Sequence, residues 1–350
     1  MPSSIPASAS PSGPQPLLEV RDLSVSFRTE RGLLAAVDRI SFRVDAGEIL
    51  GVVGESGSGK TVSLMSVMGL INDPNAVIGG SILYKGRELV GLSQRQLRSV
   101  RGKEIAMIFQ DPMTALTPVY TIGWQIIEQL RAHNDLSRSA ARKQAIELLA
   151  AVGIPNPSVT IDRYPHQLSG GMRQRGFIAM ALSCNPSLLI ADEPTTALDV
   201  TVQAQILELI KRLRRDFGSS IVLITHDMGV VAEVADRVMV MYAGRIVERG
   251  TTRDVFTSPW HPYSWGLHDS IPPMAGARPR RLPSIPGSPP SLLDLTSGCA
   301  FSPRCKHRFS RCAEKPALAG EGGHEAACFL SPEQRQQVLV ARRRPLKEAS

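Results

Sequence analysis

Eight residues constrain this sequence most, because they fit the pattern G-x-x-x-x-G-K-[ST]: Gly54-Glu55-Ser56-Gly57-Ser58-Gly59-Lys60-Thr61. The apolar run Ile49–Val53 before them predicts a buried strand, and 61–70 has helical periodicity. A strand, loop and helix in this order direct backbone N–H groups at one point, which stabilises polyphosphate. Lys60 can reach the β- and γ-phosphates, and the Thr61 hydroxyl can ligate Mg²⁺. The sequence therefore predicts a nucleoside triphosphate site.

Four polar residues follow other predicted strands. Asp192 and Glu193 come directly after an apolar run, and such strand ends are where open α/β sheets bind ligands. Asp192 is predicted to hold Mg²⁺ through water, and Glu193 to orient and deprotonate the attacking water. Gln110 is expected to contact Mg²⁺ or this water, and His226 the γ-phosphate. Together these residues predict hydrolysis of the bound nucleotide.

The periodicity of the chain predicts an α/β fold. Strands are expected at 17–27, 36–44, 49–53, 79–84, 105–109, 188–191, 221–225, 237–242 and 245–248, and helices at 61–70, 121–133, 139–152, 172–183 and 200–217. Strands that alternate with helices from 48 to 236 indicate a mostly parallel sheet, preceded by an antiparallel pair joined through a polar connection at 28–34. Helices at about 111–183 interrupt the alternation and predict a helical insertion.

Domain boundaries follow from composition. Residues 1–16 are rich in Pro, Ser and Ala and are expected to be disordered, 17–255 form the nucleotide-binding domain, 256–330 a Pro-rich extension, and 331–350 a basic tail. Most of the net charge of +8 lies after Phe256. This excess could meet nucleic acid or an anionic membrane surface, or could simply be solvated. No apolar run approaches the roughly 18 residues of a membrane span, and no secretory signal is evident, so a cytoplasmic protein is expected.

Four of the five cysteines gather in the extension with the spacing C-x5-C-x6-C-x15-C: Cys299, Cys305, Cys312 and Cys328. Four thiolates within thirty residues suggest a metal site. Close C-x2–4-C pairs are absent, which favours a [4Fe–4S] cluster; zinc, with His324 as a spare ligand, and free thiols remain alternatives. The fifth, Cys184, is most simply a small buried residue.

The segment Leu168–Arg175 resembles the signature sequence of ATP-binding cassette (ABC) ATPases, with the Q-loop, D-loop and switch histidine matched by Gln110, Ala197-Leu198-Asp199 and His226. The resemblance covers about Leu17 to Gly250. It implies two cassettes facing head to tail, with Ser169, Gly170, Gly171 and Arg173 closing on the nucleotide of the partner. Phe27 would stack on adenine, although it could equally be a core residue, and Met172 departs from the Gln that is commonest there.

The extension resembles the tail of the peptide/nickel importer branch, in the stretches His261-Pro262-Tyr263, Ile285–Pro290 and Cys299–Cys305. In that branch the first of two paired ATPases carries this tail and is reported to hold a cluster. The resemblance implies ATP hydrolysis for dipeptide or oligopeptide uptake, with a second ATPase, two permeases and an extracytoplasmic binding protein as partners. Nickel, glutathione or another solute is the alternative. A soluble ABC ATPase acting on DNA or ribosomes is disfavoured, because the chain has one P-loop and no heptad run.

Overall fold

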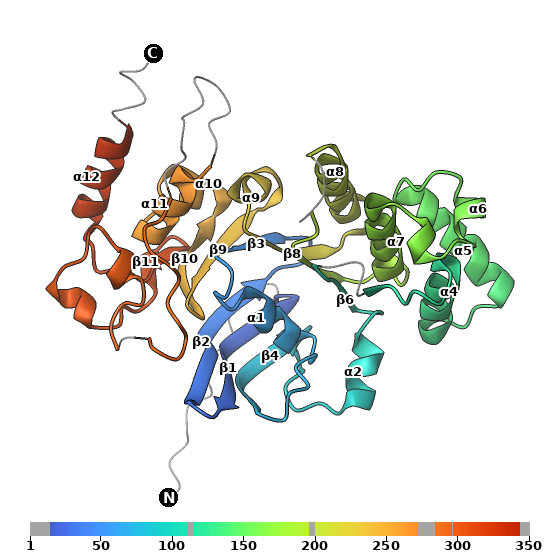
Figure 1. Ribbon diagram of the computed structural model, residues 1–350, viewed down its shortest axis with the longest axis horizontal. Helices are drawn as coiled ribbons and strands as arrows, with labels where there is room; N and C mark the ends of the chain where they lie inside the picture. Colours follow the sequence, from blue (N-terminus) through green and yellow to red (C-terminus); the bar gives the residue numbers. More distant parts are fainter. Residues whose placement is uncertain (1–14, 111–114, 196–199, 272–283, 296, 344–350) are drawn as a thin grey trace, which may run out of the picture.

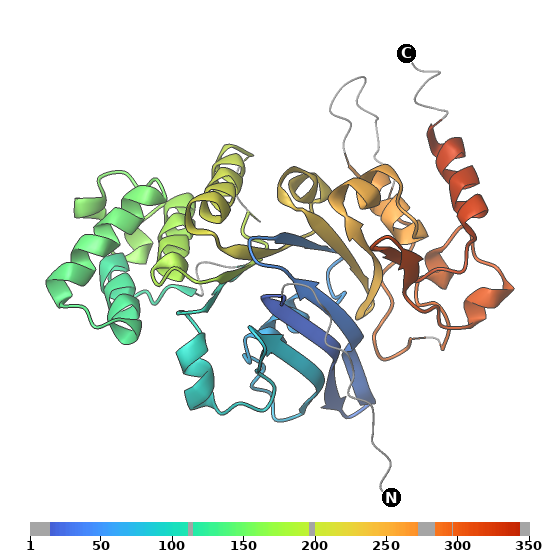
Figure 2. The ribbon, with the colours of Figure 1, turned by 180° about the vertical axis from the view of Figure 1, so that it is seen from behind.

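The computed structural model describes residues 15–110, 115–195, 200–271, 284–295 and 297–343, so that 1–14, most of the segment expected to be disordered, lie outside it. Two sheets form the centre of the molecule (Figure 1). The helical insertion lies at one end and the C-terminal extension at the other, as the view from behind also shows (Figure 2). The parts of the nucleotide site come from the region between these ends.

The smaller sheet is antiparallel, in the order β2-β1-β4-β5. Its strands are β1 (Leu18–Thr29), β2 (Gly32–Val44), β4 (Ala76–Tyr84) and β5 (Arg87–Glu88). The predicted polar connection 28–34 was too long, because β1 and β2 continue to a two-residue turn at 30–31. Irregularities between Val20 and Ser26 account for the slip in the apolar alternation of β1.

The larger sheet has the order β11-β12-β10-β9-β3-β8-β7-β6. Its parallel part consists of β3 (Ile49–Val53), β6 (Ile105–Ile108), β7 (Leu188–Asp192), β8 (Ser220–Thr225) and β9 (Arg237–Tyr242). The antiparallel strands are β10 (Arg245–Thr251), β11 (Ala319–Glu321) and β12 (His324–Ala326). Because both faces of β3, β6, β7 and β8 are buried, their sequences are continuous apolar runs. The predicted parallel sheet is thus confirmed.

The helices outside the extension are α1 (Lys60–Val67), α2 (Gln94–Val100), α4 (Ile122–His133), α5 (Arg138–Ala151), α6 (Pro157–Thr160), α7 (Gly170–Leu182), α8 (Val200–Phe217) and α9 (Met228–Val234). Helices α4 to α7 form the insertion. The hydroxyls of Thr121, Ser137 and Ser169 each accept an N–H of the first turn of α4, α5 and α7, which fixes where these helices begin.

The part of the chain that follows β10 is more helical than predicted. It contains α10 (Thr252–Thr257), α11 (Pro262–Asp269) and α12 (Pro332–Arg343). The Pro-rich extension includes the helix α11. Pro262 is compatible with the first position of a helix, and His261 accepts the N–H of Tyr263 at 3.1 Å. The expected basic tail includes α12, which packs Leu339 near Trp265. In the described residues, no helix combines the length and apolarity that a bilayer span requires.

Candidate nucleotide-binding and catalytic site

The P-loop, residues 54–61, connects β3 to α1 and curls around the ammonium group of Lys60. Lys60 is 6% exposed, and its Nζ donates to Gly54 O at 2.7 Å and to Glu55 O at 3.0 Å. Burial lowers the pKa of Lys60, whereas neighbouring carboxylates act in the opposite sense. A buried cation among carbonyl groups at the start of a helix is suited to hold a polyphosphate.

Two glycines let the P-loop lie directly on neighbouring backbone. Gly54 has φ +152°, and a Cβ there would lie 2.2 Å from Met241 O in β9. Gly59 has φ +96°, and a Cβ there would lie 2.6 Å from Ala36 O in β2. By contrast, within the described chain nothing lies within 4 Å of a Cβ built on Gly57. The loop is therefore closed on the side of the two sheets and open at Gly57.

Asp192 and Thr61 form a fitting site for a divalent cation. Asp192 ends β7 and is 3% exposed. Burial raises its pKa, and a hydrogen bond from Thr61 lowers it. Its Oδ1 is buried without a hydrogen-bond partner among the described residues. Because an unsatisfied buried carboxylate oxygen is costly, the pair fits a Mg²⁺ ion or its water ligands.

The ends of β6, β7 and β8 bring the three candidate catalytic residues together. Gln110 Nε2 donates to Glu193 Oε2 at 2.9 Å, and His226 Nδ1 lies 3.4 Å from Glu193 Oε1. Glu193 has φ +46°, and its N–H donates to Ile224 O at 2.9 Å. Such a left-handed conformation costs about 1–3 kcal/mol in a residue other than glycine, and this strain is typical of functional sites. The geometry places a carboxylate between an amide and an imidazole.

The signature residues lie at the exposed start of α7. Ser169 and Gly170 are exposed, and Ser169 Oγ accepts the N–H of Met172 at 3.3 Å. Arg173, which is predicted to contribute to the nucleotide site of a partner, donates within its own chain from Nε to Pro165 O at 2.6 Å, in the turn before α7. Both ribbon views place α7 with the insertion and away from α1 (Figures 1 and 2). The signature therefore does not cover the P-loop of its own chain.

Phe27 and Asp199 are the two remaining residues that the sequence predicted for the site. Phe27, in β1, is half-buried and packs against the core beneath the smaller sheet, so its ring has both a buried and an open part. Asp199, with the rest of the predicted D-loop, lies outside the described residues.

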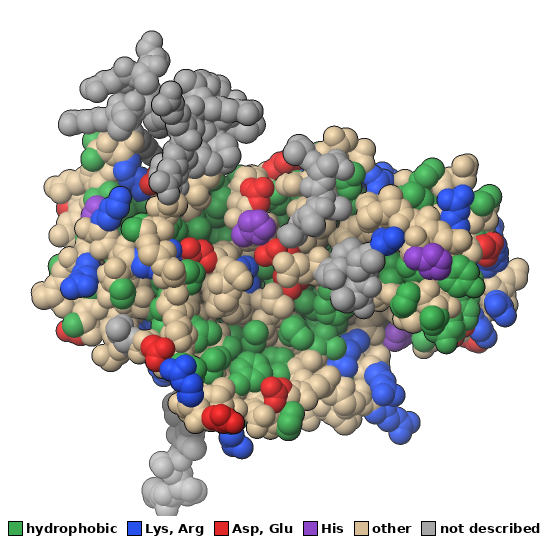
Figure 3. All heavy atoms as spheres, in the orientation of Figure 1, with side chains coloured by type: hydrophobic (Ala, Val, Ile, Leu, Met, Phe, Trp, Pro, Cys, Tyr) green, Lys and Arg blue, Asp and Glu red, His purple; other side chains and the backbone are tan. Residues whose placement is uncertain are grey.

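The insertion carries an exposed aromatic pair. Tyr120 and Trp124, at the start of α4, stack with ring centroids 3.9 Å apart and are 42% and 38% exposed. Val119 beside them is 70% exposed. The space-filling view shows hydrophobic side chains gathered on this part of the insertion (Figure 3). Exposed aromatic side chains of this kind are typical of protein interfaces.

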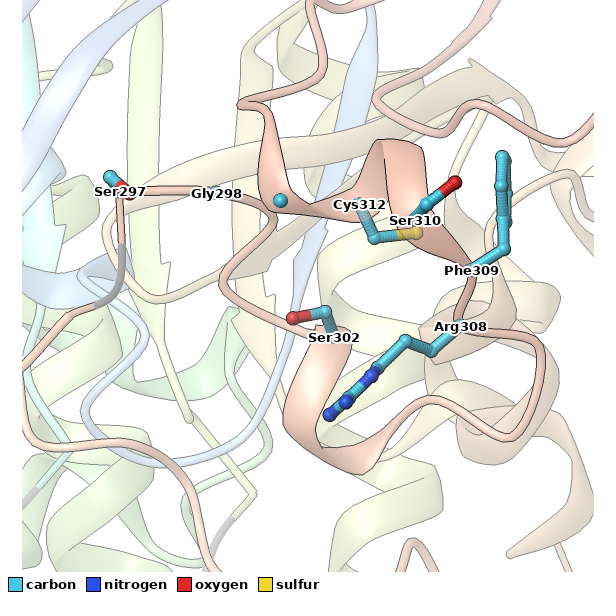
Figure 4. Close-up of a pocket in the computed structure, with 8 residues that line it drawn as sticks. Ser297, Gly298, Ser302, Arg308, Phe309, Ser310 and Cys312 are labelled. Carbon is cyan, nitrogen blue, oxygen red and sulfur yellow. The ribbon is translucent and has the colours of Figure 1, made fainter.

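The four cysteines of the extension lie near one another, and none is in a disulfide. Burial, together with a smaller effect of the other three thiols, raises the pKa of Cys305 to about 11. Within the described residues, however, no three Cys, His, Asp or Glu side chains are arranged as ligands of a single metal ion. A hollow of about 560 Å³, lined by Cys312, Ser302 and Arg308 among others, opens beside the group (Figure 4).

His324, the spare ligand of the zinc alternative, takes part in a buried network. Its Nε2 lies 2.8 Å from Glu248 Oε1, and its ring stacks on Trp260 with centroids 3.9 Å apart. Glu248 is fully buried in β10 and also accepts the N–H groups of Trp260 and His261. His324 is therefore held by Glu248 through Nε2.

Sequence reasoning missed two residues at the P-loop. Tyr263 and Arg304 come from the extension, and both contact Glu55. Both residues stand in stretches that resemble the tail of the peptide/nickel importer branch, but nothing in the sequence indicated that they contact Glu55.

The fold and the site together define a P-loop nucleotide hydrolase with an antiparallel subdomain and a helical insertion. The family profile "ABC transporter" matches residues 37–196, and the profile "Oligopeptide/dipeptide transporter, C-terminal region" matches residues 247–312. A probable peptide ABC transporter ATP-binding protein of Sinorhizobium fredii is 51% identical over 91% of this chain and 96% of its own length. The oligopeptide transport ATP-binding protein of Bacillus subtilis is 54% identical (83% and 82% covered), and the dipeptide transport ATP-binding protein of Escherichia coli is 50% identical (86% and 92%).

Solved structures of ABC cassettes have a similar fold. The ATP-binding cassette MJ0796, described as dimeric and bound to ADP and Pi, superposes with a TM-score of 0.62 at 26% identity, over 67% of this chain and 99% of that one. The protein cbiO1 of Clostridium perfringens gives 0.58 at 27% identity, over 69% and 90%. The chain belongs to the family of ABC transporter ATP-binding proteins, in the branch that carries the oligopeptide/dipeptide C-terminal region. It is an ABC-type ATPase.

Proposed function

We propose that this ATPase powers the uptake of dipeptides or oligopeptides as the ATP-hydrolysing subunit of an ABC importer. The observation that carries the proposal is that relatives about half identical to this chain, named for oligopeptide and dipeptide transport, match it through the cassette and into the extension. Nickel, glutathione or another small solute remains the alternative, because this subunit does not itself bind the solute.

The P-loop is proposed to hold the phosphates of ATP through its backbone N–H groups and Lys60, with Phe27 stacked on adenine. Thr61, Gln110 and Asp192 are the residues that would hold Mg²⁺, and the unsatisfied Oδ1 of Asp192 supports this. When bound, the ion would neutralise the negative charge that develops on the phosphates.

In the proposed reaction, Glu193 orients a water molecule and takes its proton as the water oxygen attacks the γ-phosphorus. The bond from that phosphorus to the β–γ bridging oxygen breaks, and ADP leaves. Gln110 holds the Glu193 carboxylate, and His226 contacts the γ-phosphate. Because Glu193 sits between these two side chains, its carboxylate is already oriented before the substrate binds.

A second, homologous cassette is proposed to complete the site. Ser169, Gly170 and Gly171 are exposed or half-exposed at the start of a helix, where N–H groups favour an anion. Together with Arg173 they would close on the ATP of the partner, with Asp199 at the interface. Hydrolysis would then open the pair.

Two membrane permeases and an extracytoplasmic binding protein would complete the importer, and the chain would lie on the cytoplasmic face of the inner membrane. The exposed pair of Tyr120 and Trp124 supports the insertion as the surface that receives the permeases. No nucleic acid partner is proposed.

Uptake in the natural host tests the function. Cells whose chromosomal copy carries Lys60→Ala should lose uptake of a labelled dipeptide, whereas cells with Lys211→Ala, a half-exposed lysine of α8 that pairs with Glu233, should retain it. Unlabelled peptides should compete in wild-type cells. Competition by nickel or glutathione alone, or normal peptide uptake with Lys60→Ala, would contradict the proposal.

We also propose that Cys299, Cys305, Cys312 and Cys328 hold a [4Fe–4S] cluster. The four irons of a cluster spread its thiolate ligands further apart than one ion does. The other three thiols all act on the pKa of Cys305, so the four side chains lie near one another, which supports a shared cluster.

Anaerobic purification followed by iron, sulfide and zinc analysis tests the cluster. About four irons and four sulfides per chain are expected. Serine variants of the four cysteines should lose the iron, whereas Cys184→Ser should keep it. Stoichiometric zinc, or no metal, would contradict the assignment.

A further inference from the structure

Glu55, in the P-loop, is held by two side chains of the C-terminal extension. Its N–H donates to Tyr263 Oη at 2.8 Å. Its carboxylate accepts two hydrogen bonds from Arg304, from Nη1 to Oε2 at 2.6 Å and from Nη2 to Oε1 at 2.9 Å. We propose that Arg304 and Tyr263 are positioning residues that hold the P-loop in the shape that binds ATP. This inference rests on the proposal that the P-loop holds the phosphates.

Burial and hydrogen bonds fix the side chain of Arg304 in one position. It is 8% exposed, and its Nε donates to Pro286 O at 2.9 Å and its Nη2 to Gly287 O at 3.2 Å. Nη1 also lies 3.3 Å from Tyr242 Oη in β9. The guanidinium is planar and donates to a carboxylate, two carbonyls and a hydroxyl. Only one orientation of the group satisfies all of these hydrogen bonds. Arg304 therefore ties the Pro-rich segment, the sheet and the P-loop together.

Tyr263 is equally fixed. It is fully buried in α11, and its ring lies 4.7 Å from that of Tyr242 and 5.4 Å from that of Phe301. Packing on both neighbours sets the ring plane, and the ring sets where the hydroxyl oxygen lies. The hydroxyl thus offers the N–H of Glu55 an acceptor at a defined position.

Glu55 also contacts the phosphate-binding lysine, Lys60. The carbonyl of Glu55 accepts from Lys60 Nζ at 3.0 Å, so Glu55 is held by its N–H, its carboxylate and its carbonyl. A loop that is already ordered loses less conformational freedom when a ligand binds. Arg304 and Tyr263 should therefore strengthen ATP binding. The groups of the chemical step, on β6, β7 and β8, are not held by them.

If Arg304 and Tyr263 served only stability, their loss would have a different effect on ATP binding. If the contacts with Glu55 only attach the extension to the cassette, their loss should lower the melting temperature and leave ATP affinity unchanged. A positioning role predicts weaker ATP binding and a higher KM, with kcat preserved at saturating ATP.

The test uses the full-length chain for binding of a fluorescent ATP analogue with Mg²⁺, and the assembled transporter for KM and kcat. Tyr263→Phe keeps the ring and removes the acceptor, and Arg304→Lys keeps the charge and removes the fork. Each should weaken binding about three- to tenfold, the range expected for losing one or two hydrogen bonds. Arg249→Gln is the matched control, because it breaks the pair of Arg249 with Glu325 between β10 and the extension, away from the P-loop.

Lys60→Ala distinguishes failure of the positioning role from failure of the ATP site itself. Loss of binding with Lys60→Ala, together with affinity within twofold of wild type for Tyr263→Phe, overturns the positioning role and leaves the ATP site standing. Retained affinity with Lys60→Ala overturns both. Should Arg304→Lys not fold, Tyr263→Phe decides alone. A fall in kcat at unchanged KM also contradicts the positioning role.

Discussion

Replacing Glu193 by Gln removes the proposed general base while keeping the size of the side chain. The structure gives Glu193 no phosphate-binding task, since Lys60 and the P-loop lie on another strand–helix junction. A positioned general base contributes about 10²- to 10⁴-fold to a rate, so kcat should fall by that factor. The dissociation constant for ATP should stay within about threefold, because the hydrogen bonds of a neutral amide replace those of the carboxylate.

Phosphate release by the assembled transporter and ATP binding by the isolated chain measure the two quantities. Glu233→Gln is the matched control, because Glu233 is an exposed carboxylate on α9 that pairs with Lys211 at 2.6 Å, and it should behave as wild type. Turnover of Glu193→Gln within tenfold of wild type would remove Glu193 as the base. Loss of ATP binding in the same variant would show that Glu193 contributes to substrate binding and not only to the chemical step.

Three further predictions concern the metal site, the P-loop and pH. Asp192→Asn should raise the Mg²⁺ concentration for half-maximal activity at least about tenfold, since a carboxylate ligand is lost; an unchanged Mg²⁺ titration would contradict its role. Gly54→Ala should lower the melting temperature and abolish ATP binding, because its Cβ would lie 2.2 Å from Met241 O; a stable variant that binds ATP would refute the required close approach. Burial lowers the pKa of His261 to about 4, so the unfolded state takes up a proton first as the pH falls below 6.5. The free energy of unfolding should therefore drop by up to about 3 kcal/mol between pH 6.5 and 4, and denaturant titrations should find a shallower drop for His261→Asn.

The catalytic residues could be found from the sequence because each follows an apolar run. Glu193 and His226 come directly after buried strands, and parallel strands bring their carboxyl ends to one edge of a sheet. Local pattern and topology were therefore sufficient to place Gln110, Glu193 and His226 in one site. The left-handed backbone of Glu193 was not predictable, because it depends on the bond of its N–H to Ile224 in the neighbouring strand.

The contacts of the extension could not be predicted from the sequence, because they join residues far apart in the chain. Arg304 and Glu55 are 249 positions apart, and no periodicity connects them. The helix α11 was hidden by its proline, although Pro262 stands at the one helical position that tolerates it. Arg173 matched a signature, but nothing in the sequence indicated that its guanidinium would turn back to Pro165.

Transport by the purified complex tests the central claim most directly. The complex, isolated from its natural host through a tag on this chain, would be reconstituted in vesicles together with its binding protein. ATP on the side of this chain should drive accumulation of a labelled dipeptide on that side, with phosphate released in proportion. With Glu193→Gln, accumulation and phosphate release should both fall to background while the complex remains assembled. Dipeptide accumulation without ATP, or undiminished accumulation with Glu193→Gln, would contradict the account.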